Sequence, residues 1–156
     1  MHALARVGVL EERPAVEARE DLLDARDHLH HNGQKRARAG VAVDRSADSI
    51  VALLADDALG AGRESPQALA DYQRAFENLD ANTLLAVAEI EGAVRATLQM
   101  TVIQGLSNRG AKFALIQAVR VDSGLRGQGV GAAFMAWALD QARARGCSKA
   151  ELFTHE

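Results

Sequence analysis

The segment Arg126–Gly131 reads Arg-Gly-Gln-Gly-Val-Gly, and its setting is the feature that most constrains the fold of this chain. Before it, the apolar run 115–121 predicts a strand, and after it the apolar spacing over 130–145 predicts an amphipathic helix. Another strand is predicted over 149–154. A strand, a helical crossover and a second strand in this order are typical of a parallel strand pair, so the sheet is expected to be partly parallel.

The same glycine-rich segment predicts a binding site for a phosphate or pyrophosphate group. Glycines let the backbone approach an anion and adopt positive φ, and the following helix presents free N–H groups and the positive end of its dipole. Arg126 adds a permanently charged donor. No Gly-Lys-Ser/Thr follows, and Ala132 stands where a dinucleotide fingerprint has its third glycine, so neither of those motifs is present. A glycine-eased turn without a ligand is the alternative interpretation.

Upstream, the sequence predicts two consecutive helices. The first follows Ser46, a residue suited to an N-cap, and the second begins at Ser65-Pro66, an N-cap followed by a proline in the first helical position. Tyr72 and Phe76 of the second helix lie at helical spacing. They are predicted to be core residues, with the lining of a substrate cleft as the alternative.

Residues 84–90, the turn Glu91-Gly92 and residues 94–102 predict a β-hairpin. The second of these strands alternates apolar with polar residues, which predicts one buried face, and its polar members are Arg95, Thr97, Gln99 and Thr101. With a short strand at 41–43, the element order is β-α-α-β-β-β-α-β. It predicts an α/β (α+β) fold with a mixed, mostly antiparallel sheet flanked by helices.

The first forty residues differ from the rest, so we expect an N-terminal helical extension and linker over 1–40 and the main domain over 41–156. Residues 16–31 predict a charged helix, and the basic, small residues 34–40 predict a linker. Three histidines near the end of that helix, His28, His30 and His31, have the spacing of a solvated surface. No metal site is predicted.

Composition narrows the classes of function. A formal net charge of −3 gives no support for nucleic-acid binding. The single cysteine, Cys147, excludes an intramolecular disulfide framework and a zinc site with several cysteines. No apolar run reaches the ~18–20 residues of a membrane span and no signal peptide is visible, so we expect a cytoplasmic protein without a membrane partner.

Residues 116–131 resemble the acetyl-CoA-binding motif of the GCN5-related N-acetyltransferase (GNAT) superfamily. That motif reads Arg/Gln-x-x-Gly-x-Gly/Ala, and its defining places hold Arg126, Gly129 and Gly131. The resemblance extends over about residues 41–155. It implies a GNAT-like acyl-CoA N-acyltransferase fold and acetyl-CoA as cosubstrate. It also implies transfer of the acetyl group to a primary amine, expected to be that of a small molecule, by direct attack on the thioester.

The resemblance also implies which residues contact the cosubstrate. Its pyrophosphate would lie on the backbone N–H groups of Arg126, Gly127, Gln128, Gly129, Val130, Gly131 and Ala132. Its pantetheine arm would pair like an extra strand beside Val119 to Val121, where the family has a bulge that splays two strands apart. A backbone N–H near Val119 would polarise the thioester carbonyl.

The catalytic residues are not identified by the resemblance. Many relatives have a glutamate base at the position of Gln117, and a neutral amide does not accept a proton at useful pH. Glu89, Glu151 and His155 are alternative bases, although a solvated surface position suits each of them as well. The tyrosine that protonates the leaving thiolate in many relatives has no counterpart near the end of this chain.

Family members usually continue with a helix and two strands beyond the point where this sequence stops, at Glu156. We therefore expect a C-terminally truncated domain, or a fragment, whose open strand edge is covered by a second copy in a homodimer or by the N-terminal segment. The missing base and the missing segment together motivate an alternative function, a non-catalytic acyl-CoA-binding or regulatory module.

Overall fold

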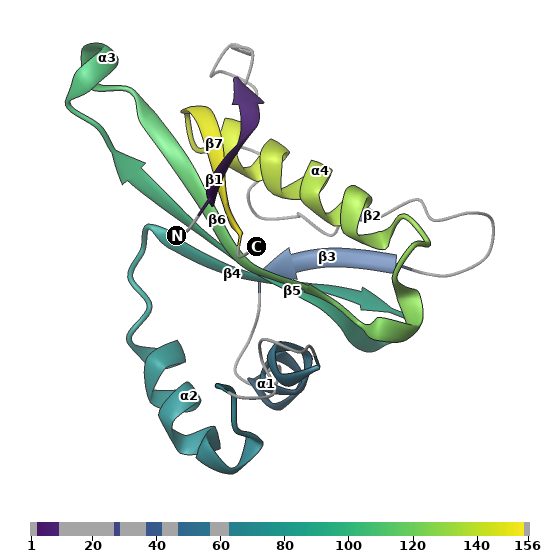
Figure 1. Cartoon of the computed structure of the whole chain (residues 1–156). Coiled ribbons are helices and arrows are strands. Elements are labelled where there is room, and N and C mark those ends of the chain that lie inside the picture. The colour runs from purple at the N-terminus through teal and green to yellow at the C-terminus, as the bar shows by residue number, and fades with distance from the viewer. Residues whose placement is uncertain (1–2, 10–26, 29–36, 42–46, 57–62, 155–156) are drawn as a thin grey trace.

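The computed structural model describes residues 3–9, 27–28, 37–41, 47–56 and 63–154 (Figure 1). Within them, seven strands form one sheet in the order β1-β7-β6-β5-β4-β3-β2. The strands are β1 (Ala3–Val9), β2 (Asp27–His28), β3 (Ala37–Val41), β4 (Thr83–Ile90), β5 (Ala93–Gln104), β6 (Lys112–Val121) and β7 (Cys147–Thr154). The helices are α1 (Ala47–Ala55), α2 (Leu69–Glu77), α3 (Ser107–Gly110) and α4 (Val130–Ala144), with 3-10 turns η3 (Pro66–Ala68) and η4 (Ser123–Leu125).

The sheet is mixed, as the sequence predicts. Strands β6 and β7 pair in parallel, with α4 as the crossover between them, and the other described neighbours pair antiparallel. Glu91 and Gly92 join β4 to β5 with φ of 55° and 81°, the left-handed backbone that a two-residue hairpin turn requires. The predicted hairpin is therefore confirmed.

Helices cover both faces of the sheet (Figure 1). Helix α4 packs on one face, where Leu98, Met100, Ile116 and Phe134 are fully buried. Helices α1 and α2 lie on the other face, and Ile50 of α1 is buried there with Val87 of β4. The main core thus lies between the sheet and α4, and a smaller one lies under α1 and α2.

The prediction that β5 has one buried face is wrong at Thr97. Its side chain is only 1% exposed, because α1 covers the face that the alternation assigns to solvent. The buried hydroxyl donates a hydrogen bond of 3.1 Å to the carbonyl of Ala86. Threonine tolerates this position because its polar atom has a partner.

Two predictions for the N-terminal forty residues are wrong where the structure describes them. Asp27–His28 belongs to a strand and not to a helix. Ala37–Val41 is also a strand, paired antiparallel with β4, and not a linker, since Ala39 is buried against the main core. The rest of the predicted helix, His30, His31, Ser46 and the strand residues 42–43 lie outside the described residues.

The outer edge of β7 is paired within the chain. Strand β1 runs antiparallel to it, from Ala3 opposite Thr154 to Val9 opposite Lys149. This is the N-terminal cover that the sequence offers as one alternative. Among the described residues, no helix is both long and apolar enough to cross a membrane.

Candidate cofactor groove and acceptor cavity

Strands β6 and β7 diverge at a bulge in the middle of β6. Their pairing runs from Lys112 to Ile116 and stops there. On the other side, β5 pairs with Gln117 and then with Arg120, so one extra β6 residue is inserted between these two pairs. Ala118 has φ of 52°, a left-handed conformation that is uncommon for a residue other than glycine. In the described part of the chain, β6 beyond Ile116 therefore has one open edge.

The bulge also reverses which face of the sheet the β6 side chains occupy. Ile116 packs towards α4, and beyond the bulge it is Val119 and Val121 that pack against the same core. The N–H of Asp122 donates to the carbonyl of Arg95 on β5, at 2.8 Å. Because backbone groups alternate along a strand, the amides of Val119 and Val121 point to the opposite, open edge.

Two arginine side chains donate hydrogen bonds to backbone carbonyls of this open edge. Arg120 Nη1 donates to the carbonyl of Val119 at 2.9 Å, and Arg126 Nε donates to the carbonyl of Val121 at 3.2 Å. A ligand that donates to these carbonyls would compete with the two guanidinium groups, although each carbonyl oxygen has a second lone pair. The amides of the same edge can pair with an added strand by β-augmentation.

The glycines of the following loop lie at positions with different structural requirements. Gly127 and Gly129 have φ of 74° and 83°, and a Cβ at either position would meet no atom within 4 Å. They are required for backbone conformation and not for space. A Cβ at Gly131 would lie 3.4 Å from Val121 Cγ2, an ordinary van der Waals contact, so this position faces β6 without requiring glycine.

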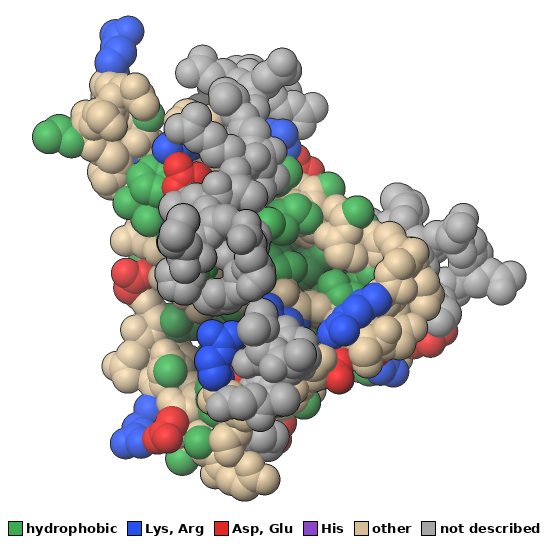
Figure 2. Space-filling model, viewed as in Figure 1, with side chains coloured by type: hydrophobic (Ala, Val, Ile, Leu, Met, Phe, Trp, Pro, Cys, Tyr) green, Lys and Arg blue, Asp and Glu red, His purple; other side chains and the backbone are tan. Residues whose placement is uncertain are grey.

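The start of α4 presents unpaired backbone donors. Its first intrahelical hydrogen bond runs from the N–H of Ala133 to the carbonyl of Gly129, at 3.0 Å. The N–H groups of Val130, Gly131 and Ala132 therefore have no intrahelical acceptor, and the helix dipole adds positive potential. In Figure 2 the loop lies towards the right of the molecule, where much of the surface is tan backbone and small side chains. This is a cradle suited to an anion.

Arg126 is held away from this cradle by the end of α1. Its Nη2 donates to the carbonyl of Asp56 at 3.0 Å and lies 3.9 Å from that residue's carboxylate. The Asp56 carboxylate also accepts from the N–H of Ser123 at 3.2 Å. The role of Arg126 as a phosphate donor stays a prediction. Its partner Asp56 was not foreseen, because nothing in the sequence links positions 70 residues apart.

Two further side chains shape the loop. Gln128 donates from its amide to the carbonyl of Gly124 at 2.9 Å, so it braces the loop. Asp122 accepts from Arg95 Nη1 at 2.7 Å and from the N–H of Gly124 at 2.9 Å. The hydrogen bond from Arg95, followed by that from Gly124, holds the pKa of the Asp122 carboxyl below its usual value.

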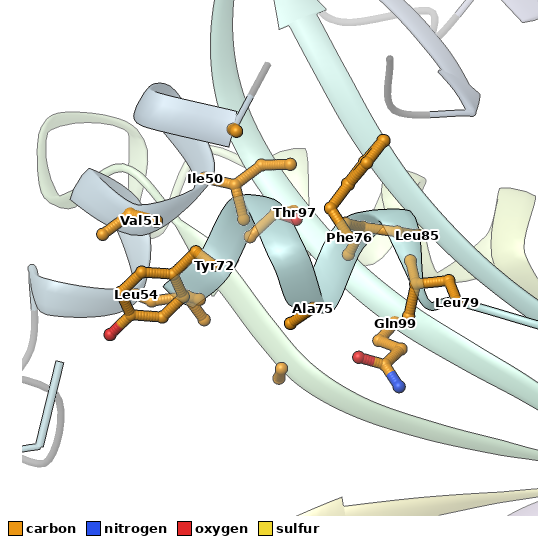
Figure 3. A pocket seen from close by; sticks show the side chains of 12 residues that line it. Ile50, Val51, Leu54, Tyr72, Ala75, Phe76, Leu79, Leu85, Thr97 and Gln99 are labelled. Carbon is orange, nitrogen blue, oxygen red and sulfur yellow. The ribbon is translucent and has the colours of Figure 1, made fainter. Parts of the chain in front are cut away.

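A largely apolar cavity of about 140 Å³ lies between α1, α2 and the sheet and reaches the bulge (Figure 3). Helix α1 contributes four side chains, helix α2 and the turn after it contribute four, and the strands contribute four. They are Ala47, Ile50, Val51, Leu54, Tyr72, Ala75, Phe76, Leu79, Leu85, Thr97, Gln99 and Ala118. Tyr72 and Phe76 thus line a cavity, which is the alternative that the sequence left open for them.

The residues considered as general bases do not line this cavity. Gln117 lies directly opposite Gln99 in the ladder, so both amides are on the α1 and α2 side of the sheet. Glu151 lies one strand further away on β7, where its carboxylate accepts from Lys149 Nζ at 2.7 Å. Glu89 is four residues along β4 from the cavity residue Leu85, which is about 13 Å. His155 lies outside the described residues.

Tyr72 is the ionisable residue in the described lining. Its hydroxyl donates to Glu64 Oε2 at 2.7 Å and accepts from the N–H of Ser65 at 3.1 Å. The bond to the Glu64 carboxylate raises the pKa of the phenol, because it stabilises the protonated form. This hydroxyl remains protonated at neutral pH, and it both donates and accepts a hydrogen bond.

The sequence model described as the acetyltransferase (GNAT) family matches residues 47–156, which is more than half of the chain. The chain belongs to the GNAT acetyltransferase family. The match covers the GNAT glycine loop and both helices that line the cavity.

Solved structures agree with this GNAT assignment. A transcriptional regulator from Bacillus halodurans C-125 is 34% identical, with a TM-score of 0.74 over 78% of this chain and 83% of the other. Glucosamine-6-phosphate N-acetyltransferase from Arabidopsis thaliana is 20% identical, with a TM-score of 0.64 over 76% and 82%. A predicted acetyltransferase with acetyl-CoA from Clostridium acetobutylicum is 18% identical, with a TM-score of 0.62 over 79% and 82%. No curated protein matches significantly.

The similarity to the Arabidopsis and Clostridium structures, at 20% and 18% identity, shows the GNAT fold alone. The family and these neighbours support acetyl transfer in general terms. Among the described residues of this GNAT chain, no group of three or more His, Cys, Asp or Glu side chains is arranged to hold a metal ion.

Proposed function

We propose that this chain transfers the acetyl group of acetyl-CoA to the primary amine of a small molecule. The observation that carries the proposal is the meeting of two sites at one point of β6. The open edge beyond Ile116 leads to the free N–H groups of α4, and the cavity under α1 and α2 reaches the same strand at Ala118. A thioester donor and an amine acceptor could meet there.

The residues present fit the donor. The N–H groups of Val130, Gly131 and Ala132, which lack intrahelical acceptors, would hold the pyrophosphate, and Gly127 and Gly129 adopt the required positive φ. The N–H groups of Arg126 and Gln128 already donate to the carbonyls of Ser123 and Leu125 at 3.4 Å, so they would join the cradle only by leaving these acceptors. The amides of Val119 and Val121 would pair with the pantetheine arm. Acetyl-CoA supplies a thioester, whose carbonyl is open to direct attack by a neutral amine.

In the proposed reaction the amine nitrogen attacks the thioester carbonyl carbon. A C–N bond forms, the C–S bond breaks, and the sulfur leaves with the bonding electron pair. The proton lost by the nitrogen passes to solvent, and the thiolate takes one from solvent. The protein contributes orientation of the two reactants and a backbone N–H near Val119 that stabilises the developing oxyanion.

The described lining provides no carboxylate that could take the proton from the amine. Gln117 offers only an amide, and Tyr72 is already bonded to Glu64. The acceptor would therefore react from the small fraction that is neutral in solution. This is compatible with the position of the cavity, because an apolar site favours the neutral form of an amine.

Calorimetric titration with CoA, followed by an assay of thiol release from acetyl-CoA with a panel of amines, tests the proposal. We expect CoA to bind in the micromolar range and thiol release to depend on an added amine. No binding at millimolar CoA would contradict the proposal. Binding without turnover for any amine would contradict catalysis and leave the groove as a cofactor site.

A second candidate is a non-catalytic acyl-CoA-binding or regulatory module. Gln117 in the place of a base supports it, as does the 34% identical structure, which is that of a transcriptional regulator. Amine-dependent turnover by a preparation free of contaminating acetyltransferase would exclude this candidate. Because both candidates share the CoA site, turnover is the measurement that separates them.

A further inference from the structure

The cavity under α1 and α2 has the size of one small ring. Its volume is about 140 Å³, and an engineered apolar cavity of about 150 Å³ in another protein takes up benzene. The cavity ends at Ala118, beside the edge where the proposed acetyl group would lie. An acceptor bound with its nitrogen at the bulge would therefore have room inside the cavity for a compact body, and a longer chain would leave it past the exposed Ala75.

The walls of this cavity are mostly hydrocarbon. Figure 3 shows Ile50 and Leu54 from α1, Phe76 from α2, Leu79 from the turn after α2 and Leu85 from β4 around the space. None of the described lining residues carries a charge at neutral pH. A second charge on the acceptor, or a phosphate, would lose its hydration here without gaining a partner, which is strongly unfavourable.

One polar group of the lining remains available. The hydroxyls of Tyr72 and Thr97 are engaged by Glu64 and by the carbonyl of Ala86. The amide of Gln99 makes no hydrogen bond to any other residue that the structure describes. Its carbonyl oxygen can accept from an amine N–H, and its position next to the bulge would direct that nitrogen towards the open edge of β6.

On the basis of the function proposed above, we propose that the acceptor is a primary monoamine with a compact hydrocarbon body. One ring or a short branched chain fills the cavity, and the nitrogen hydrogen-bonds to Gln99. Such a molecule buries apolar surface and carries only the one charge that it loses before reaction. Polyamines, aminoglycosides and sugar phosphates do not meet these conditions.

Acceptor preference is measured with the full chain and saturating acetyl-CoA at pH 8.5. The panel contains benzylamine, 2-methylbutylamine, spermidine and glucosamine 6-phosphate. We expect kcat/KM, expressed per concentration of neutral amine, to be about tenfold or more higher for the first two than for the other two, which is the gain from burying two methylene groups in an apolar site. A preference for spermidine or glucosamine 6-phosphate would overturn the proposal.

A second experiment tests the cavity without catalysis. Binding of 4-fluorobenzyl alcohol, a neutral analogue of the same size, is followed by fluorine NMR in the wild type and two variants. Ala75→Trp places a large ring at an exposed lining position of α2, and Ala70→Trp places it at an exposed position of the same helix outside the lining. We expect Ala75→Trp to weaken binding by about tenfold and Ala70→Trp to leave it unchanged.

CoA titration of the same three proteins separates the two proposals. If 4-fluorobenzyl alcohol binds in an Ala75-dependent way and CoA does not bind, the cavity's preference stands and the acetyltransferase function fails. If CoA binds and 4-fluorobenzyl alcohol does not bind at millimolar concentration, the acceptor class proposed here is wrong and the acetyltransferase function stands.

Discussion

Asp56, which follows helix α1, is hydrogen-bonded to Arg126, which begins the glycine loop. Arg126 Nη2 donates to the carbonyl of Asp56 at 3.0 Å and lies 3.9 Å from its carboxylate. Helix α1 lines the cavity proposed for the acceptor, and the loop forms the proposed pyrophosphate cradle. An anion that drew this guanidinium into the cradle would break its contacts with Asp56 at the end of α1.

Replacing Arg126 with alanine tests how much of the cradle is backbone. The change removes one cation and also releases the Val121 carbonyl for pairing, so these effects partly offset each other. We expect the Kd for CoA, measured by calorimetry, to rise by no more than about tenfold. Arg109→Ala, at the exposed tip of the β5–β6 connection, controls for loss of charge. A hundredfold loss would mean that the side chain is the main phosphate ligand.

A carboxylate introduced at the start of α4 should abolish CoA binding. Gly129→Asp forces a side chain onto a residue with φ of 83° and places a negative charge among the free N–H groups. Gly92→Asp is the matched control, because its φ is 81° and it too has no atom within 4 Å of a Cβ. We expect both variants to lose about 1 kcal/mol of unfolding free energy, measured in urea, and only Gly129→Asp to lose CoA affinity. Equal CoA affinities of Gly129→Asp and Gly92→Asp would show that the glycine loop does not bind CoA.

The Asp122 carboxylate should stabilise the fold at neutral pH and not in acid. Its pKa is lowered in the folded state, so its contribution is complete above about pH 5 and is lost as pH falls below the ordinary value near 3.9. The measurement compares the unfolding free energies of the wild type and Asp122→Asn from pH 3 to pH 7. Asp140→Asn, at an exposed position of α4, is the control. A difference that does not shrink in acid would contradict the role of the charge.

Tyr72→Phe should destabilise the protein without closing the cavity. It removes the hydrogen bonds to Glu64 and from the N–H of Ser65, which together are expected to contribute about 1 kcal/mol at this partly exposed site. The pKa of the phenol is raised in the folded state, so its contribution is complete below about pH 10 and declines as pH rises further. Urea unfolding of the wild type and Tyr72→Phe at pH 7 and pH 10.5 measures both effects. Equal unfolding free energies of the two proteins at pH 7 would contradict the stabilising role of the hydroxyl.

The rate of acetyl transfer should follow the neutral fraction of the amine. With no carboxylate in the described lining, log kcat/KM for an alkylamine should rise with a slope near one from pH 7 to about pH 9, because such amines have pKa values near 10. Tyr72 does not interrupt this rise, since its pKa is raised by Glu64. A plateau beginning near pH 6–7 would reveal an ionisable base, with Glu151 or His155 as the variants to examine.

The glycine loop and the sheet that leads to it could be predicted from the sequence for physical reasons. Glycines at positions 127 and 129 indicate positive φ, and both have it. The alternation of β5 and the turn at 91–92 indicate a hairpin, because such turns favour residues that tolerate left-handed backbone. These are local signals, carried by a few neighbouring residues.

Other parts of the site have no local signal. The bulge lies at Ala118, and an alanine in the sequence does not indicate a left-handed backbone as a glycine does. The partnership of Asp56 with Arg126, and the burial of Thr97 under α1, arise only when distant elements meet. Strands β1 and β3 have apolar residues at alternate positions, but most of these are alanine, which is depleted in strands, so the local signal is weak.

The bulge makes β6 a strand whose two halves are out of phase by one residue. Removing Ala118 would bring the halves back into phase, since side chains alternate with a period of two. Val119 and Val121 would keep their places against α4, and β6 would no longer bend away from β7 after Ile116. The loss of a single codon would in this way convert a binding surface into ordinary sheet, in a chain that otherwise keeps every residue of its glycine loop.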